Sequence, residues 1–264
     1  MKVGISQLVL GREARLSEWL PMAREAGYEC FEALLTDAGD LTMDSGPAEY
    51  RRLLDLSKAS GVELVSLCAS LSHQGSLTSG QPGDRERFRA VAGKMAEAAQ
   101  ALGIDAVLVI PGGVSADVRY DVAYQRALEG MRGVAPLAER AGVTLAIEYV
   151  WNNLFLSPLE MRRFLDEVGS PRVGFYMDPG NMAIFGYPEH WIEIVGSHIK
   201  RVHFKDWSRS ARNWPPLTQG DLEWPKIMSA LRAIPYDGPV ISEVDGDWEA
   251  HRRTAETMRE ILAL

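Results

Sequence analysis

The feature that most restricts the fold of this chain is a regular alternation of strand-like and helix-like stretches. Short runs rich in β-branched and aromatic residues alternate with longer segments whose apolar residues recur at helical spacing. Helical patterns cover residues 16–26, 48–59, 85–102, 120–141, 159–168 and 191–195. Eight candidate strands begin near Val3, Tyr28, Val62, Asp105, Val143, Arg172, Ile199 and Pro239.

Glycine and proline residues agree with this alternation. Glycines 27, 61, 103 and 142 each stand between a helical pattern and the next strand, where a helix end favours positive φ. Pro47, Pro158 and Pro188 fall at helix starts, where a missing N–H costs nothing. Eight strand–helix units predict an α/β fold whose parallel strands close into a single-domain (β/α)8 TIM barrel.

An open, doubly wound sheet is the competing fold. Its dinucleotide-binding form carries a Gly-x-Gly-x-x-Gly motif after the first strand, and this chain has no such motif there. Pro111-Gly-Gly113 is interpreted as a turn, because it lacks the lysine of a phosphate-binding loop. The closed barrel is therefore favoured.

The length and charge limit the classes of function. At 264 residues, with no linker or low-complexity tract, the chain fits one barrel over residues 1–264. The sequence shows no signal-peptide pattern and no apolar run of about 18 residues, so we expect a cytoplasmic protein without a membrane partner. A net charge of −8 argues against nucleic-acid binding. Cys30 and Cys68 lie in predicted strands, where we expect buried, reduced thiols.

Four metal-type residues occupy the carboxyl ends of the last four predicted strands. They are Glu148, Asp178, His203 and Glu243. Side chains alternate between the two faces of a strand, and in each strand the apolar residues take the opposite face from these four. If the apolar face packs on the helices, the four residues point into the barrel at the edge where barrel active sites form.

Three carboxylates and one imidazole suit one divalent metal ion. This donor set favours a hard or borderline ion such as Mn²⁺, Mg²⁺ or Co²⁺ over a structural zinc site. Four protein ligands on an octahedral ion leave two positions for substrate oxygens, as catalysis requires. The sequence thus predicts a catalytic metal site held by consecutive strand ends.

At this point the chain resembles the xylose isomerase-like barrel superfamily of sugar isomerases and epimerases over essentially its whole length. The most specific stretches are Ala146-Ile-Glu148, Asp178-Pro-Gly-Asn181, Val202-His203-Phe-Lys-Asp206, Gly220-Asp-Leu-Glu-Trp224 and Ser242-Glu243. In ketose 3-epimerases of this family, residues matching Glu148, Asp178, His203 and Glu243 bind the metal, Mn²⁺ foremost, with Mg²⁺, Co²⁺ or Zn²⁺ as alternatives. The resemblance implies that Glu148 and Glu243 also act as the acid and base.

Two positions differ from the free-ketose 3-epimerases. Those enzymes commonly carry a histidine where this chain has Asn181, and a substrate-binding glutamate where it has Leu154. The Asp-x-Gly-Asn form is more similar to the L-xylulose-5-phosphate 3-epimerase branch, which keeps a sugar phosphate open as substrate. Arg209 matches the spacing of a substrate-binding arginine in the free-ketose enzymes.

Further residues are expected near the substrate. Glu32 has inward parity and could bind a hydroxyl or pair with a base in the barrel core. The set with proposed substrate contacts comprises Glu32, His73, Trp151, Asn153, Asn181, Lys205 and Arg209, with Asn152 and Trp207 as neighbours of the same loops.

The leading hypothesis is a metal-dependent sugar or sugar-phosphate epimerase or isomerase, which removes a proton next to a carbonyl and passes through an enediolate stabilised by the metal. The runner-up is a lyase of the same family, inosose dehydratase-like or 3-keto-glycoside-cleaving. An abasic-site endonuclease and a non-catalytic sugar-binding module are weaker alternatives. The sequence leaves open which substrate is used and whether the chain forms a homo-oligomer.

Overall fold

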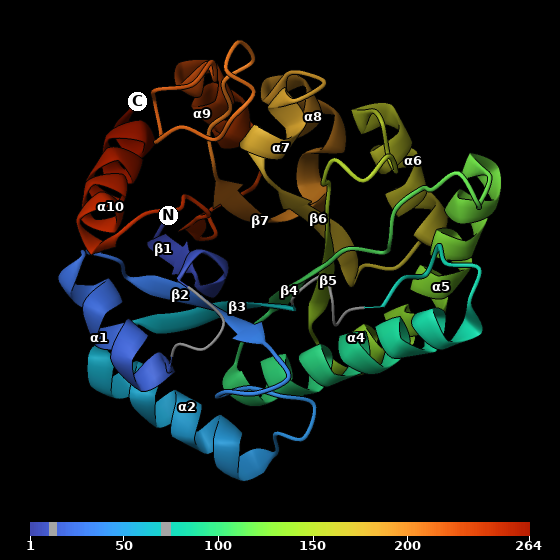
Figure 1. The fold of residues 1–264 in the computed structure, drawn as a ribbon, viewed down its shortest axis with the longest axis horizontal. Helices are drawn as coiled ribbons and strands as arrows, with labels where there is room; N and C mark the ends of the chain where they lie inside the picture. Colours follow the sequence, from blue (N-terminus) through green and yellow to red (C-terminus); the bar gives the residue numbers. More distant parts are fainter. Residues whose placement is uncertain (11–14, 70–74) are drawn as a thin grey trace.

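A computed structural model describes residues 1–10, 15–69 and 75–264. Eight parallel strands form a closed ring in chain order, and the first strand pairs with the last through the register Val3 to Val240. The strands are β1 (Val3–Ser6), β2 (Cys30–Leu35), β3 (Glu63–Ala69), β4 (Ala106–Val109), β5 (Thr144–Glu148), β6 (Val173–Met177), β7 (Ile199–Phe204) and β8 (Val240–Ser242). The (β/α)8 barrel predicted from the alternation is confirmed (Figure 1).

Helices surround the ring of strands (Figure 1). They are α1 (Leu16–Glu25), α2 (Pro47–Ser60), α4 (Pro82–Leu102), α5 (Tyr120–Ala141), α6 (Pro158–Val168), α7 (Pro179–Ala183), α8 (Pro188–Val195), α9 (Trp224–Arg232) and α10 (Trp248–Ala263), with the 3₁₀ helices η1 (Gln7–Val9) and η2 (Gly196–His198). Trp19 of α1 packs on Trp248 of α10, with ring centroids 5.1 Å apart. The layer of helices therefore closes between its first and last members, as the strands do.

The glycines predicted to end helices and the prolines predicted to begin them occupy these positions in the structure. Glycines 27, 61, 103 and 142 all have positive φ at helix ends. Pro47, Pro158 and Pro188 are the first residues of their helices. Helices α9 and α10 lie outside the predicted helical ranges, although Trp224, Ile227, Met228 and Leu231 do recur at helical spacing and are buried. The pattern for α9 was thus present in the sequence.

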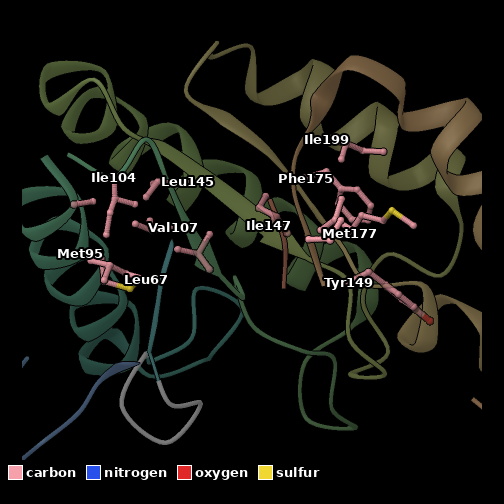
Figure 2. Close-up of a cluster of buried hydrophobic side chains, with 14 of the residues drawn as sticks. Leu67, Met95, Ile104, Val107, Leu145, Ile147, Tyr149, Phe175, Met177 and Ile199 are labelled. Carbon is pink, nitrogen blue, oxygen red and sulfur yellow. The ribbon is translucent and has the colours of Figure 1, made fainter. Parts of the chain in front are cut away.

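Two apolar layers separate by strand parity. The outer layer, between strands and helices, contains Leu145 and Ile147 of β5 with Phe175 and Met177 of β6 (Figure 2). The inner layer fills the barrel with the alternate residues, such as Ala146, Tyr176 and Ile241. The predicted inward and outward faces are therefore confirmed for these strands. Cys30 and Cys68 are buried free thiols, as expected.

Within the part of the chain that the structure describes, no helix combines the length and apolarity needed to cross a membrane.

Candidate active site at the carboxyl end of the barrel

Four side chains from consecutive strands meet at one end of the barrel. Glu148 is the last residue of β5, Asp178 directly follows β6, His203 lies in β7 and Glu243 directly follows β8. One ligand atom from each residue lies within 4.8 Å of the others. The backbone N–H of Glu243 donates to Phe204 O at 3.1 Å, so the β7–β8 pairing continues to the site. The barrel thus fixes the backbone of all four residues.

Asp178 is both a strand end and a helix cap. Its Oδ1 accepts a hydrogen bond from Asn181 N at 3.1 Å, at the start of the short helix α7. A methyl group at Gly180 would lie 3.0 Å from Lys205 Cβ, so this helix approaches β7 closely because position 180 lacks a side chain. The other oxygen, Asp178 Oδ2, is buried and has no hydrogen-bond partner among the described residues. A buried carboxylate oxygen without a partner is costly, and an oxygen-loving cation would satisfy it.

His203 is fully buried between two carboxylates. Its Nε2 lies 3.0 Å from Glu32 Oε1, below the four-residue set. Its Nδ1 lies 3.2 Å from Glu148 Oε1 and 4.0 Å from Glu243 Oε2. A hydrogen on Nε2, paired with Glu32, leaves Nδ1 as the nitrogen available to the other three groups. Carboxylate–histidine pairs of this kind orient metal-binding histidines in proteins.

Glu32 is held by hydroxyl groups on three strands. Its Oε1 accepts from Ser6 Oγ at 2.7 Å, and its Oε2 accepts from Ser66 Oγ and Tyr176 Oη at 2.7 Å each. The Glu32 side chain is fully buried. The expectation that Glu32 contacts substrate therefore does not fit, because its oxygens are engaged inside the barrel. Glu32 instead matches the alternative prediction, a carboxylate in the barrel core that pairs with a base, here His203.

The charges at the site raise some pKa values and lower others. Burial raises the pKa of Glu148 to about 8, with a further contribution from the charge of Glu243. Burial also raises the pKa of Asp178 to about 6. Burial alone would raise the pKa of Glu243, but the charges of Lys205 and His203 lower it overall. Without a metal, Glu148 is therefore protonated at neutral pH while Glu243 is charged.

The pKa of His203 also reflects its neighbours. Burial would lower it, but the negative charge of Glu32 and the bond to Glu148 raise it well above the usual range. In the metal-free protein, protons on His203 and Glu148 thus partly neutralise the clustered carboxylates. Three carboxylates and one imidazole fit a divalent ion, which would take over this neutralising role.

Lys205 provides a cation beside the four residues. Its Nζ donates to Glu243 Oε2 at 2.7 Å and lies 4.5 Å from the centroid of the Trp214 ring. Trp214 in turn contacts Trp207, with ring centroids 4.6 Å apart. Lys205 is thus held between a carboxylate and an aromatic face.

The loop that carries Trp207 and Trp214 is anchored by Asp206. Asp206 Oδ1 accepts from Trp207 N at 2.8 Å, and Oδ2 accepts from Thr218 N at 2.8 Å, from Gly220 N at 3.3 Å and from Trp224 Nε1 at 3.2 Å. Asp206 is fully buried. Asp206 therefore joins two of the stretches that carry the family resemblance, Val202–Asp206 and Gly220–Trp224, by hydrogen bonds. This contact between the two ends of the loop could not be predicted from the sequence.

A cavity of about 310 Å³, a size that suits a small ligand, lies against two of the four residues, Glu148 and Glu243. Its polar lining combines Glu148, Glu243, Lys205, Asn181 and Asn152, and its apolar lining includes Trp151 and the barrel residues Leu108 and Ile110. Asn181 is 2% exposed, and its amide Oδ1 has no hydrogen-bond partner among the described residues. Three of the expected substrate residues, Trp151, Asn181 and Lys205, thus border this cavity.

Other expected substrate residues lie elsewhere. Asn153 borders a second cavity, although its neighbour Asn152 lines both. The Arg209 guanidinium donates to Gly186 O at 2.9 Å and lies 4.8 Å from the Tyr187 ring centroid, so it does not line the first cavity. The intervening loop turns the Arg209 side chain towards the residues between α7 and α8. His73 lies outside the described residues.

Two curated relatives match most of the chain. A 2-epi-5-epi-valiolone 7-phosphate 2-epimerase of Actinoplanes sp. is 28% identical over 231 residues, which cover 83% of this chain and 82% of the relative. An L-ribulose-5-phosphate 3-epimerase of Salmonella paratyphi A is 26% identical over 238 residues, which cover 86% and 81%. Both are epimerases whose names specify a phosphorylated compound.

Solved structures show the same fold. The crystal structure of a D-psicose 3-epimerase in the presence of D-fructose superposes with a TM-score of 0.83 at 22% identity over all of both chains. A D-psicose 3-epimerase with D-tagatose from Clostridium cellulolyticum H10 has a TM-score of 0.84 at 19% identity and covers 100% of this chain and 98% of that one. At these identities the likeness establishes the fold. A model of the xylose isomerase-like TIM barrel family matches residues 20–263, and the chain belongs to that family.

Proposed function

We propose that this protein is a divalent-metal-dependent epimerase or isomerase of a sugar or sugar phosphate. The observation that carries the proposal is the meeting of Glu148, Asp178, His203 and Glu243 within 4.8 Å, beside a small, mostly apolar cavity that Glu148 and Glu243 line. The two relatives that match most of the chain, both epimerases, support the same reaction class.

The four residues would hold one divalent ion, for which Mn²⁺ is the first choice and Mg²⁺, Co²⁺ or Zn²⁺ the alternatives. The buried Asp178 Oδ2, which has no hydrogen-bond partner among the described residues, supports this assignment. His203 Nδ1 supports it too, because it lies among the carboxylates of the set, 3.2 Å from Glu148 Oε1, while Nε2 pairs with Glu32. When bound, the ion would stabilise negative charge that develops on the substrate oxygens.

Glu148 and Glu243 would exchange protons with the substrate carbon next to the carbonyl. They come from β5 and β8 and flank the two residues supplied by β6 and β7. If one glutamate removes the proton and the other returns it to the opposite face, the carbon is inverted and the product is an epimer. Return on the same face to the neighbouring carbon would give aldose–ketose isomerisation.

Residues around the cavity would orient the sugar. The free amide oxygen of Asn181 would accept a hydrogen bond from a substrate hydroxyl, and Lys205 Nζ would donate one to a substrate oxygen. The exposed indole of Trp151 would cover an apolar C–H face of the sugar.

Incubation of the Mn²⁺-loaded protein with ketoses and ketose phosphates in D₂O tests the proposal. We expect NMR to show that one deuterium is incorporated at the carbon next to the carbonyl. The sugar should otherwise keep all of its atoms. Loss of water or of an aglycone would instead identify the lyase alternative.

The variants Glu148→Gln and Glu243→Gln should slow this exchange by about 10²–10⁴-fold, the usual contribution of a general acid or base. Circular dichroism would check that each variant is folded. Exchange that continues at the wild-type rate in both variants would refute the assignment of these glutamates.

A further inference from the structure

A second cavity adjoins the first on the same end of the barrel. Its volume is about 790 Å³, and it is bordered by the loops that follow β3, β4 and β5 together with the start of α4. Asn152 lines both cavities. Both cavities lie at the same end of the barrel and meet at Asn152, so a group attached to a sugar in the first cavity would pass over Asn152 to enter the second.

Hydrogen bonds tie the three loops together around this second cavity. Thr78 Oγ1 donates to Gly113 O at 2.6 Å, which joins the first two loops. Asn152 Nδ2 donates to Gly112 O at 2.6 Å, and Val114 N donates to Asn152 O at 2.9 Å, which joins the second and third. The walls of the cavity are thus connected to one another and to the residue shared with the first cavity.

The Pro111-Gly-Gly113 turn makes this connection possible. Gly112 has a φ of 137°, and a methyl group there would lie 2.3 Å from Ser76 Oγ and 2.4 Å from Thr78 Oγ1. A methyl group at Gly113 would lie 2.8 Å from Asn152 O. Any side chain at either position would push the loops apart. The turn, which the sequence presents without a phosphate signal, therefore has a structural role in the second cavity.

The chemistry of the lining favours a neutral, hydroxyl-rich group. The polar side chains that border the cavity are hydroxyls, amides and two carboxylates, and no lysine or arginine is among the described lining residues. Asp84 stands in the first turn of α4 and accepts from Ser79 Oγ at 2.6 Å. The helix start, which would otherwise attract an anion, thus already carries a negative charge. Hydroxyls and amides both donate and accept hydrogen bonds, as a sugar requires.

We propose that the second cavity is a subsite for a neutral sugar or polyol group joined to the sugar that reacts in the first cavity. This inference rests on the proposed function for the identity of the reacting sugar. It differs from the names of the curated relatives, which specify phosphates, because a phosphate in the second cavity would face Asp84 and Asp117. The two arginines beside the lining, Arg85 and Arg126, do not line the cavity and donate to the backbone carbonyls of Ser79 and Thr78.

Three matched probes test the inference by calorimetry on the Mn²⁺-loaded, full-length protein: fructose, fructose 6-phosphate and 6-O-glucosyl-fructose. We expect 6-O-glucosyl-fructose to bind about tenfold more tightly than fructose, a gain that one or two net hydrogen bonds would provide, and fructose 6-phosphate to bind no more tightly than fructose. Equal or weaker binding of the glucosylated ketose, or tightest binding of the phosphate, would overturn the proposal.

Two variants show where the glucosyl group binds. Ser115 is exposed and lines the second cavity, whereas Ala116 is exposed and does not line it. Ser115→Trp should abolish the gain for 6-O-glucosyl-fructose and leave fructose binding unchanged, and Ala116→Trp should change neither. A gain that persists in Ser115→Trp would place the glucosyl group elsewhere. Deuterium exchange reports on the first cavity alone, so a failure of the proposed function is seen separately.

Discussion

The polar groups below the site and those at the site itself differ in how completely they are hydrogen-bonded. Below the site, fully buried Glu32 accepts from three hydroxyls and pairs with His203. At the site itself, Asp178 Oδ2 and Asn181 Oδ1 are also buried but have no hydrogen-bond partner among the described residues. Buried polar atoms usually are paired, so the first region is complete within the protein and the second requires a ligand. We propose that the lower group, Glu32 and its hydroxyl partners, positions His203, and that the upper group, Asp178 and Asn181, contacts the metal and the substrate.

The largest effect that this comparison predicts is on stability. Glu32→Ala should lower the free energy of unfolding by about 3–5 kcal/mol, because it leaves His203 and three hydroxyls without their common acceptor. Ser66→Ala, which removes one of the donors, should cost only about 1 kcal/mol. Urea unfolding monitored by circular dichroism measures both.

If Glu32→Ala does not fold, Glu32→Gln replaces it, with Mn²⁺ affinity as the second measurement. We expect a loss of about 10–100-fold in affinity, since histidine ligands depend on their carboxylate partner to this extent. If the variant and the wild type had the same stability and the same Mn²⁺ affinity, Glu32 would have no role in positioning His203.

The next effect concerns metal binding at the upper group. Asp178→Asn should weaken Mn²⁺ binding by more than about 100-fold, which is the upper range for losing only a partner of a ligand. Stability without metal should change little or improve, because the orphaned oxygen no longer has to be buried as a charge. The exposed Asp245, two residues after Glu243 on the segment that follows β8, offers Asp245→Asn as a control. Stoichiometric metal in purified Asp178→Asn would contradict the assignment.

A smaller effect is expected from pH. Metal binding must displace the protons that Glu148, with a pKa of about 8, and His203, with a pKa well above its usual range, hold in the metal-free protein. Raising the pH from 6 to 8 weakens this competition, so Mn²⁺ affinity should increase by at least about tenfold per pH unit over this range. Calorimetry in two buffers of different ionisation enthalpy would measure the release of more than about one proton at pH 7. An affinity that stays flat over this range would count against a protonated Glu148.

The smallest effect concerns Asn181. Asn181→Ala should raise the KM for the substrate by about fivefold, the size of one ordinary hydrogen bond. It should leave the melting temperature nearly unchanged, because the amide oxygen has no internal partner to lose. A clear loss of stability with an unchanged KM would show that Asn181 stabilises the fold, as Glu32 does, and does not bind the substrate.

The sequence predicted the barrel and the meeting of the four strand ends because strand parity and strand order are local properties. Parity placed Glu148 and His203 on the inner face. The closed ring of parallel strands then brings the ends of β5 to β8 together at one end of the barrel. Parity also placed Glu32 inside, but it does not state the depth of a residue in the barrel. Glu32 is level with Ser6 in the β1–β2 register and with Ser66 in the β2–β3 register, below the cavity.

Loop residues could not be predicted in the same way. The side chain of Arg209 follows the path of its loop to Gly186, and a count of residues from the strand end contains no information on that path. Asn152 and Asn153 are neighbours in sequence, yet only Asn152 reaches both cavities. Long-range hydrogen bonds decide such positions, and they have no periodic signature.

The anchoring of the loop after β7 by Asp206 has a consequence for how this protein can evolve. One carboxylate fixes the loop where it leaves the strand, through Trp207 N, and where it returns, through Thr218 N and Gly220 N. Substitutions and insertions between those fixed ends alter the rim of the site, including the Trp214 contact of Lys205, without displacing His203. New substrate preferences can therefore arise at this loop while the residues for chemistry are inherited unchanged.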